Sequence, residues 1–388
     1  MPNIQINNQI IKSNFKTELE ITGQPELWKK LLHSYLSERN SLRKYLVNIF
    51  NNHNVEIILT GAGTSAFIGD VLLGAFQKNI DNHIIAVATT DLITHPETFF
   101  KKNKTYLVIS FARSGNSPES FQAITLSEAL SKKVFHLIIT CNEESELLRT
   151  ISTKDHFTFL MPSDADDKGL AMTGSFTSML LAGILLSRLN NDDDFEDQIN
   201  ILCNYGNRIL VDYSERLQNI AAMDFNRAVF LGSGMHKGIA RESHLKLQEL
   251  TDGKVICKYD SFMGFRHGPK AVVHDKTLVT YLFSNSDYVN QYEVDLVKSV
   301  ATGRKNLYSI GVMEKDLAIS DLDLKIVLSD NGKKLDEDFL SVVSVLPAQL
   351  LGFFKSMELG LNPDSPSDSG MIHRVVQGVN IYPYENRN

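Results

Sequence analysis

The chain has 388 residues, of which 43% are hydrophobic and 22% are charged, and its formal net charge is -7. This length predicts two domains or one duplicated domain with a proper core, and the acidic balance argues against a general nucleic-acid binder, which needs a clustered basic surface. Because the chain has neither a run of about 18 uninterrupted apolar residues nor a basic leader followed by an apolar run, we expect no membrane span and no signal peptide.

The first 50 residues are polar and have a helical pattern. Gln24-Pro25 comes just before this pattern, as a helix-start proline does. We expect residues 1–50 to form a helical arm that packs on the main body. The apolar positions that repeat at helical spacing are Leu27, Trp28, Leu31, Leu32 and Tyr35.

Short apolar runs alternate with helical patterns in the next part of the chain, residues 51–205. Such alternation is typical of a parallel, doubly wound α/β sheet. A nearly all-apolar helix, residues 173–189, closes this half and is too short to span a bilayer. Strands are expected at residues 55–60, 83–88, 105–110 and 134–140, and helices at 66–76 and up to about residue 130.

An acidic run, residues 192–194 with Glu196 and Asp197, opens the following helix. Acidic side chains favour a helix N-terminus through its dipole, so we interpret the run as a solvated helix start; a metal site is the alternative.

A second cycle of the same kind starts at residue 228. We therefore expect a second subdomain, with the C-terminal tail, over residues 206–388. A strand (228–231), a glycine loop (232–234) and a helix (236–250) repeat the earlier order about 170 residues on, which predicts an internal duplication. The chain after Gly360 is predicted to be irregular. Further strands are expected at 277–283, 307–311 and 324–327, and helices at 288–301 and 342–359.

A glycine loop follows the strand expected at residues 55–60. Ligands of open α/β sheets bind at the carboxyl ends of the strands, and Gly63 lets the backbone approach one closely. Thr64 and Ser65 add hydroxyls beside a helix N-terminus, which favours an anion.

A second loop of small residues, with Arg113, Ser114 and Ser117, follows the strand expected at residues 105–110. Together the two loops predict a site for a single phosphate. Each loop alone is equally compatible with a tight turn that holds no ligand, and neither a Walker A lysine nor the Rossmann glycine spacing is present. Arg113 either pairs with phosphate or anchors its loop to an acidic neighbour.

Three ionisable residues share one face of the helix predicted at 236–250. Glu242, Lys246 and Glu249 stand at i, i+4 and i+7. A surface ion pair is the simple interpretation, but the helix starts at a glycine loop and is followed by His267, beside Gly-Pro, whose ordinary pKa suits proton transfer. A structural histidine is the alternative for His267.

This set suits the transfer of a proton between C1 and C2 of a sugar. A partly desolvated carboxylate can remove a poorly acidic C–H proton, a histidine can open the pyranose ring, and a lysine can stabilise the enediolate. The phosphate would serve as a handle that holds the open chain in position.

The motifs resemble those of proteins with two sugar isomerase (SIS) domains, over about residues 40 to 380. They are Leu59-Thr-Gly-Ala-Gly-Thr-Ser65, Arg113-Ser-Gly-Asn-Ser-Pro-Glu-Ser120, Gly232-Ser-Gly-Met-His236, Arg241-Glu-Ser-His-Leu-Lys-Leu-Gln-Glu249 and Arg266-His-Gly-Pro269. The most similar subgroup is the AgaS type, galactosamine-6-phosphate deaminase/isomerases also called tagatose-6-phosphate ketose/aldose isomerases. Its features here are Gln24-Pro25 with Trp28, Gly264-Phe-Arg-His-Gly-Pro-Lys270 and Arg374-Val-Val-Gln-Gly378.

The resemblance implies two tandem flavodoxin-like subdomains, similar to the isomerase half of glucosamine-6-phosphate synthase. It places Ser65, Ser114 and Ser117 at the sugar phosphate and, by a partial match, Thr173 and Ser175 at a second sugar-contact loop. It implies that Glu249 is the isomerising base, that Lys246 is the helix lysine and that Glu242 is the acidic neighbour of this lysine. It also implies that His267 opens the ring and reaches the site from the neighbouring subunit, so we expect a homodimer or larger assembly with a shared site.

Three departures from the synthase stand out. Met1 is followed by Pro2 rather than by a cysteine nucleophile, so glutamine-dependent amination is not expected. The phosphate loop is longer and carries Arg113. No lysine follows Lys355 to close the site, although His373 or Arg374 could stand nearby.

The sequence therefore predicts a phosphosugar isomerase/deaminase that converts galactosamine 6-phosphate into tagatose 6-phosphate and ammonia, with no metal or organic cofactor. The alternatives are a glucosamine-6-phosphate deaminase, a phosphosugar-amine deglycase and, in another class, a non-catalytic phosphosugar sensor. Cys141, Cys203 and Cys257 are odd in number and lack metal spacing, so they predict reduced thiols and a cytoplasmic location.

Overall fold

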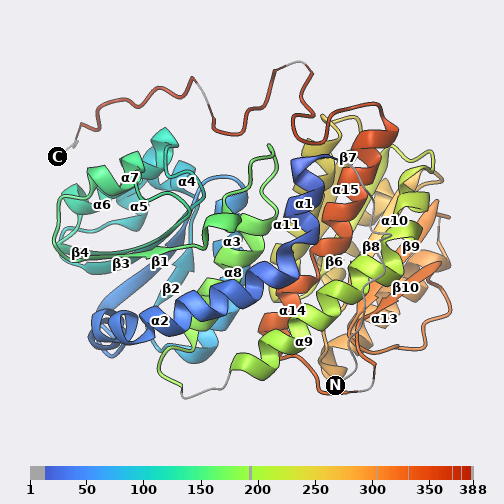
Figure 1. The fold of residues 1–388 in the computed structure, drawn as a ribbon, viewed down its shortest axis with the longest axis horizontal. Coiled ribbons are helices and arrows are strands. Elements are labelled where there is room, and N and C mark those ends of the chain that lie inside the picture. The colour runs from blue at the N-terminus through green and yellow to red at the C-terminus, as the bar shows by residue number, and fades with distance from the viewer. Residues whose placement is uncertain are drawn as a thin grey trace.

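The structure, a computed structural model, describes residues 14–191, 195–303, 305–330, 332–368, 370–376 and 378–385. Two five-stranded sheets lie on opposite sides of a central group of helices (Figure 1). The first sheet has the order β2-β1-β3-β4-β5, and the second has β10-β9-β8-β6-β7. Read from β7, the second sheet has the order β7-β6-β8-β9-β10, in which β6 corresponds to β1 and β7 to β2 of the first sheet. All strand pairs are parallel. The predicted fold, two tandem parallel α/β units, is confirmed.

The strands agree with the apolar runs of the sequence, apart from two edge strands that it did not predict. Those two, β5 and β7, are short and mostly half-exposed, and each pairs on one side only, so neither has the continuous apolar run of a buried strand. The strands are β1 (Val55–Thr60), β2 (Ile84–Ala86), β3 (Thr105–Ala112), β4 (Lys133–Thr140), β5 (His156–Leu160), β6 (Arg227–Gly232), β7 (Ile256–Asp260), β8 (Thr277–Leu282), β9 (Tyr308–Met313) and β10 (Leu324–Val327).

The helices of the first half are α1 (Lys16–Thr22), α2 (Gln24–Phe50), α3 (Thr64–Asn79), α4 (Thr89–Thr94), α5 (Pro96–Phe99), α6 (Pro118–Leu130), α7 (Glu146–Thr150) and α8 (Gly174–Ser187). Those of the second half are α9 (Phe195–Arg208), α10 (Ser214–Ala221), α11 (Met235–Leu250), α12 (Phe262–Phe265), α13 (Asp287–Ala301), α14 (Glu337–Val343) and α15 (Leu346–Glu358). The π-helical turn Ile209–Tyr213 joins α9 to α10. The boundary expected between residues 205 and 206 therefore falls inside continuous helix.

The single helix expected at residues 342–359 is instead two helices. α14 ends at Val343 and α15 begins at Leu346, so the chain turns just before Pro347. Proline lacks a backbone N–H and fits only the first turn of a helix, which explains the break. By length and apolar composition, the segment Glu337–Glu358 that holds these two helices could cross a membrane. Its apolar window is, however, wholly buried within the protein, as core helices are.

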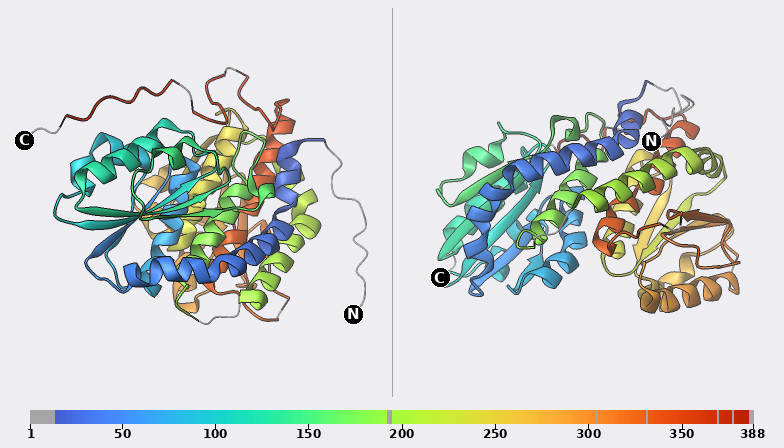
Figure 2. Two further views of the ribbon diagram at one scale, coloured as in Figure 1. Left: turned by 60° about the vertical axis from the view of Figure 1, so that its left-hand side comes forward. Right: turned by 60° about the horizontal axis from the view of Figure 1, so that its bottom comes forward.

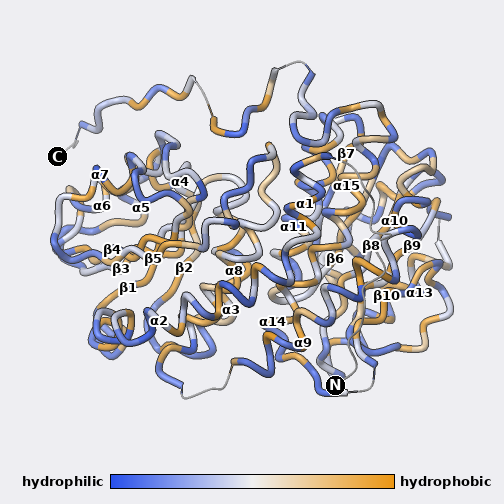
Figure 3. Tube along the Cα trace, viewed as in Figure 1, coloured by the Kyte–Doolittle hydropathy of each residue, from blue (hydrophilic) through white to orange (hydrophobic). Residues whose placement is uncertain are grey.

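The N-terminal arm, over its described residues 14–50, is an integral part of the core, and the rest of the predicted arm lies outside the described residues. The five apolar positions predicted to pack are buried along α2, which crosses the molecule in front of α8 (Figures 1 and 2). Trp28 Nε1 donates to Thr177 Oγ1 at 3.1 Å, and Tyr35 Oη donates to the carbonyl oxygen of Leu185 at 3.1 Å. α8 is buried throughout, as predicted, and the hydrophobic residues in Figure 3 follow it and the strands.

The two halves meet where α3 packs against α11. Each helix begins after a glycine of the same unusual conformation, with φ 56° and ψ -127° at Gly63 and φ 53° and ψ -125° at Gly234. A Cβ atom added to Gly238 would lie 2.6 Å from Cγ2 and 2.9 Å from the backbone nitrogen of Val71, so the contact requires glycine. The shared geometry supports the predicted duplication.

The predicted acidic helix start is described only in part. Glu196 and Asp197 lie in the first turn of α9, while residues 192–194 lie outside the described residues.

Candidate active site

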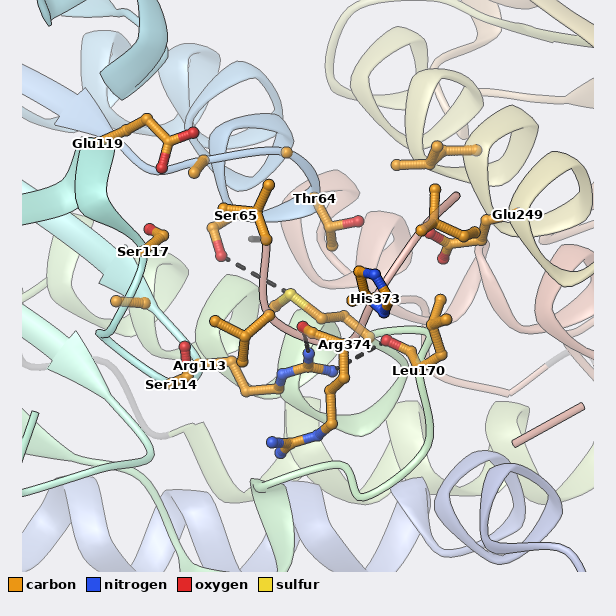
Figure 4. Close-up of a pocket in the computed structure, with 18 of the residues that line it drawn as sticks. Thr64, Ser65, Arg113, Ser114, Ser117, Glu119, Leu170, Glu249, His373 and Arg374 are labelled. Atoms are coloured by element: carbon orange, nitrogen blue, oxygen red, sulfur yellow. Dashed lines mark hydrogen bonds between the residues drawn. The ribbon is translucent and has the colours of Figure 1, made fainter. Parts of the chain in front are cut away.

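A cavity of about 620 Å³ opens at the carboxyl ends of β1 and β3. Thr60 at the end of β1 lies in register with Ser110, two residues before the end of β3, so the loops that follow these strands leave the same edge of the sheet. The volume is within the range of small-molecule sites, roughly 300–1,000 Å³. The predicted residues that line it are Gly63, Thr64, Ser65, Arg113, Ser114, Ser117 and Glu249 (Figure 4).

The N-termini of α3 and α6 bring threonine and serine hydroxyl groups to this cavity. A Cβ atom on Gly61 would lie 2.6 Å from the carbonyl of Ser65, so only glycine allows the tight turn into α3. Ser117 precedes α6, and its hydroxyl oxygen lies 2.6 Å from that of Ser120. Free N–H groups and the helix dipole favour an anion at such ends.

The opposite wall carries a buried cluster of one cation and two carboxylates on α11. Lys246 Nζ donates to Glu249 Oε1, to Thr64 Oγ1 at 3.2 Å, and lies 3.2 Å from Glu242 Oε1. Lys246 and Glu242 are fully buried, whereas the Glu249 side chain is 15% exposed and reaches the cavity. The cluster therefore links the glycine loop of the first half to α11 of the second.

Burial sets the charge state of this cluster. Burial raises the pKa of Glu242 to about 8. The charge of Lys246 acts to lower this pKa, and the nearby Glu249 acts to raise it. Burial also acts to lower the pKa of Lys246, but the two neighbouring carboxylates outweigh it and hold that pKa above its ordinary value. Near neutral pH, Glu242 keeps its proton and Lys246 is a cation, whose ammonium group pairs with Glu249.

Arg113 ties two cavity walls together. Its side chain is buried and donates to the carbonyl oxygens of Leu170, at 3.3 Å, and of Arg374, at 2.6 Å. Burial, followed by the nearby charge of Arg374, lowers the pKa of its guanidinium. Arg113 therefore holds its loop against the loop before α8 and against the tail through carbonyl groups.

Thr173 and Ser175 lie behind the cavity and do not line it. Asp167 accepts hydrogen bonds from the backbone N–H groups of Thr173 (2.8 Å), Gly174 (3.0 Å) and Ser175 (2.9 Å), and from both hydroxyls. An internal carboxylate thus occupies the N-terminus of α8 where a ligand was expected. Sequence reasoning missed Asp167 because it is too far from the helix start to form a local capping pattern.

His267 is not brought to the cavity by its own chain. It lines a separate cavity of about 300 Å³ with Lys270 and Ser299. Within one chain, therefore, the structure unites Glu249 and Lys246 with the serine loops but not with the predicted ring-opening histidine.

The equivalent loop of the second half is closed by a carboxylate. Glu293 is fully buried and accepts hydrogen bonds from the backbone N–H of Ser284 and the Asn290 side chain, each at 3.1 Å, and from the Ser233 hydroxyl. Burial raises the pKa of Glu293 to about 7. Of the two equivalent glycine loops, the one in the second half is thus filled by a carboxylate, and the one in the first half faces an open cavity.

The C-terminal tail provides a further wall that local patterns did not place. After α15 the tail runs back across the first half (Figure 1), and residues 371–376 line the cavity. His373 and Arg374, which the sequence suggested only as possible neighbours, both lie there (Figure 4). Leu170 and Met172 of the loop before α8 complete this side, and Ser65 Oγ lies 3.8 Å from Met172 Sδ.

Comparison with known proteins agrees with this architecture. The sequence pattern of the SIS domain matches residues 49–187. The D-galactosamine-6-phosphate deaminase AgaS of Shewanella sp. (strain ANA-3) is 37% identical, over 95% of this chain and 92% of that protein. The crystal structure described as tagatose-6-phosphate ketose/aldose isomerase from Escherichia coli is 34% identical, with a TM-score of 0.87 over 98% of this chain and 100% of that one. The C-terminal domain of glucosamine-fructose-6-phosphate aminotransferase from Francisella tularensis, 19% identical, shares the fold with a TM-score of 0.73, over 90% of this chain and 97% of that one.

Proposed function

The chain belongs to the AgaS family of SIS-domain proteins, and from this premise we propose that it converts galactosamine 6-phosphate and water into tagatose 6-phosphate and ammonia. One observation carries the proposal: Glu249, which pairs with the buried Lys246, faces the same cavity as two serine-lined helix N-termini. An anion site at one wall and a carboxylate base at another suit an open-chain phosphosugar.

The reaction begins with ring opening, which exposes the C1 aldehyde. Glu249 then removes the proton from C2, and the electrons move through the enol to the C1 oxygen, where Lys246 stabilises the developing charge. Return of the proton to C1, with transfer of one proton from the C2 amino group to the C1 oxygen, leaves a primary alcohol at C1 and an imine at C2. Water hydrolyses the imine to the ketone and releases ammonia. The scheme uses only side chains of the protein.

His267 is proposed to open the ring from the neighbouring subunit of a homodimer. In its own chain His267 lines a different cavity, which agrees with a role in the site of the neighbouring subunit. Mixing Glu249→Gln and His267→Gln subunits tests the sharing. Random mixed dimers should recover about a quarter of the wild-type activity, because half of the dimers are mixed and each holds one intact site. No recovery would place both residues in one subunit.

The substrate is tested by ammonia release with galactosamine 6-phosphate, glucosamine 6-phosphate and their N-acetyl forms, beside isomerisation of tagatose 6-phosphate. Ammonia from the galacto amine alone is expected. Ammonia from the gluco amine alone would replace the substrate, and isomerisation without ammonia would remove the deamination step. Binding without turnover in any assay would favour a phosphosugar sensor.

We further expect the enzyme to act in the cytoplasm. All three cysteines are free, and burial raises the pKa of each thiol, so none is a reactive thiolate. Such thiols suit a reducing compartment.

A further inference from the structure

The tail that walls the cavity is fixed to the first half at a small number of polar contacts. Asp364 accepts the backbone N–H groups of Lys16 (3.0 Å) and Thr17 (2.8 Å) at the start of α1, and its own carbonyl accepts the N–H of Leu170 (3.0 Å). Ten residues on, Arg374 Nη2 donates to Asp166 Oδ1 at 2.7 Å, and its Nε donates to the Asp167 carbonyl at 2.9 Å.

Arg113 closes this arrangement from the other side. Its Nη2 donates to the backbone carbonyl of Arg374 at 2.6 Å (Figure 4). Arg374 is thus held both at its side chain and at its backbone. Three segments far apart in the chain thus meet at Arg374: the loop after β3, the loop before α8 and the tail.

Apolar packing contributes little to holding the tail in this place. Met371 is 80% exposed and Val376 is 46% exposed, although both line the cavity. By contrast, Arg374 is two-thirds buried at its side chain, and its partner Asp166 is buried to a similar degree. Charge-assisted hydrogen bonds in such a setting contribute more than exposed ion pairs do.

We propose that Arg374 is a positioning residue, which with Arg113 and Asp166 clamps residues 371–376 as the wall that confines the sugar. Arg113 acts within this clamp and leaves phosphate to the helix N-termini of α3 and α6. This proposal depends on the proposed function only for the identity of the sugar.

Arg374→Gln and Asp166→Asn test the clamp from its two sides. Each should raise KM for galactosamine 6-phosphate about tenfold, the value of one charge-assisted hydrogen bond, and change kcat by less than about threefold, because the wall binds ground state and transition state alike. The double variant should be no worse than either single one. Arg149→Gln, which breaks an exposed Arg149–Glu146 pair on α7, is the matched control and should change neither constant.

Two measurements do not depend on turnover. Amide hydrogen exchange in residues 370–376 should become faster in both variants. Inhibition or binding by inorganic phosphate should stay within about twofold of wild type, since phosphate does not need the wall. If the protein binds phosphosugars without deaminating them, the same tenfold loss is read from calorimetric binding of tagatose 6-phosphate.

An unchanged KM in both variants would overturn the proposal, as would a large fall in kcat alone, which would make Arg374 a catalytic residue. Unaltered amide exchange in the tail would also overturn it. Weaker binding of inorganic phosphate in Arg374→Gln would instead assign the arginine to the phosphate.

Discussion

Replacement of Glu249 by Gln should stop proton transfer without weakening the fold. Glutamine has the size of glutamate and can still accept a hydrogen bond from Lys246, but it cannot take a proton from C2. Lys246 keeps a second carboxylate, Glu242, whose oxygen lies 3.2 Å from its ammonium group. The pKa of Glu242 is raised first by burial and also by the charge of Glu249. Loss of that charge lowers it, so that Glu242 ionises and becomes the counter-ion of Lys246.

The two effects have different magnitudes. A positioned general base contributes a factor of about 10² to 10⁴, so kcat should fall by that factor, which corresponds to about 3–5 kcal/mol in the activation barrier. Because a lysine–carboxylate pair survives in the variant, we expect the free energy of unfolding to change by less than about 1 kcal/mol.

Three assays separate these expectations. Ammonia release gives kcat, denaturant unfolding gives stability, and uptake of deuterium from heavy water into the sugar reports proton transfer alone. Calorimetry with tagatose 6-phosphate should show binding within about threefold of wild type. Deuterium uptake at the wild-type rate in Glu249→Gln would refute the assignment of the base. A large loss of stability would refute the idea that Glu242 replaces the lost charge.

Three further changes test the surrounding structure. Lys246→Met removes the cation that pairs with the largely buried Glu249 side chain. Unfolding in denaturant should therefore show a loss of about 3–5 kcal/mol, against little loss for Glu249→Gln. Gly238→Ala places a methyl group against the Val71 backbone. Although alanine favours helix, the variant should lose about 1–3 kcal/mol and melt at a lower temperature, and a rise in melting temperature would contradict the close α3–α11 contact. The pKa of Glu293, ordinarily near 4.5, is raised by burial to about 7. The folded protein therefore loses stability as the pH rises through this interval, and Glu293→Gln should gain about 3 kcal/mol relative to wild type between pH 4 and pH 8. A difference in stability between the variant and wild type that does not change with pH would contradict this role of Glu293.

The sequence alone determined the sheet and one face of the site, because both depend on local patterns. Buried central strands need continuous apolar runs, and parallel strands place the loops that follow them at one edge, so local pattern alone places Ser65 and Ser114 together. Helical periodicity likewise placed Lys246 and Glu249 on one face of α11. Repetition of the glycine loop predicted the duplication that the strand orders confirm.

The tertiary structure decided everything that depends on partners distant in the chain. Arg374 meets Asp167 across 207 positions, and Lys246 meets Thr64 across 182. Such hydrogen bonds leave no periodic trace in the sequence, because each joins two single residues that are far apart in the chain. For the same reason, Asp167 rather than a ligand satisfies the start of α8, and Glu293 fills the loop of the second half. Local periodicity thus identified the residues able to bind and react, and packing between distant segments decided which of them face an open cavity.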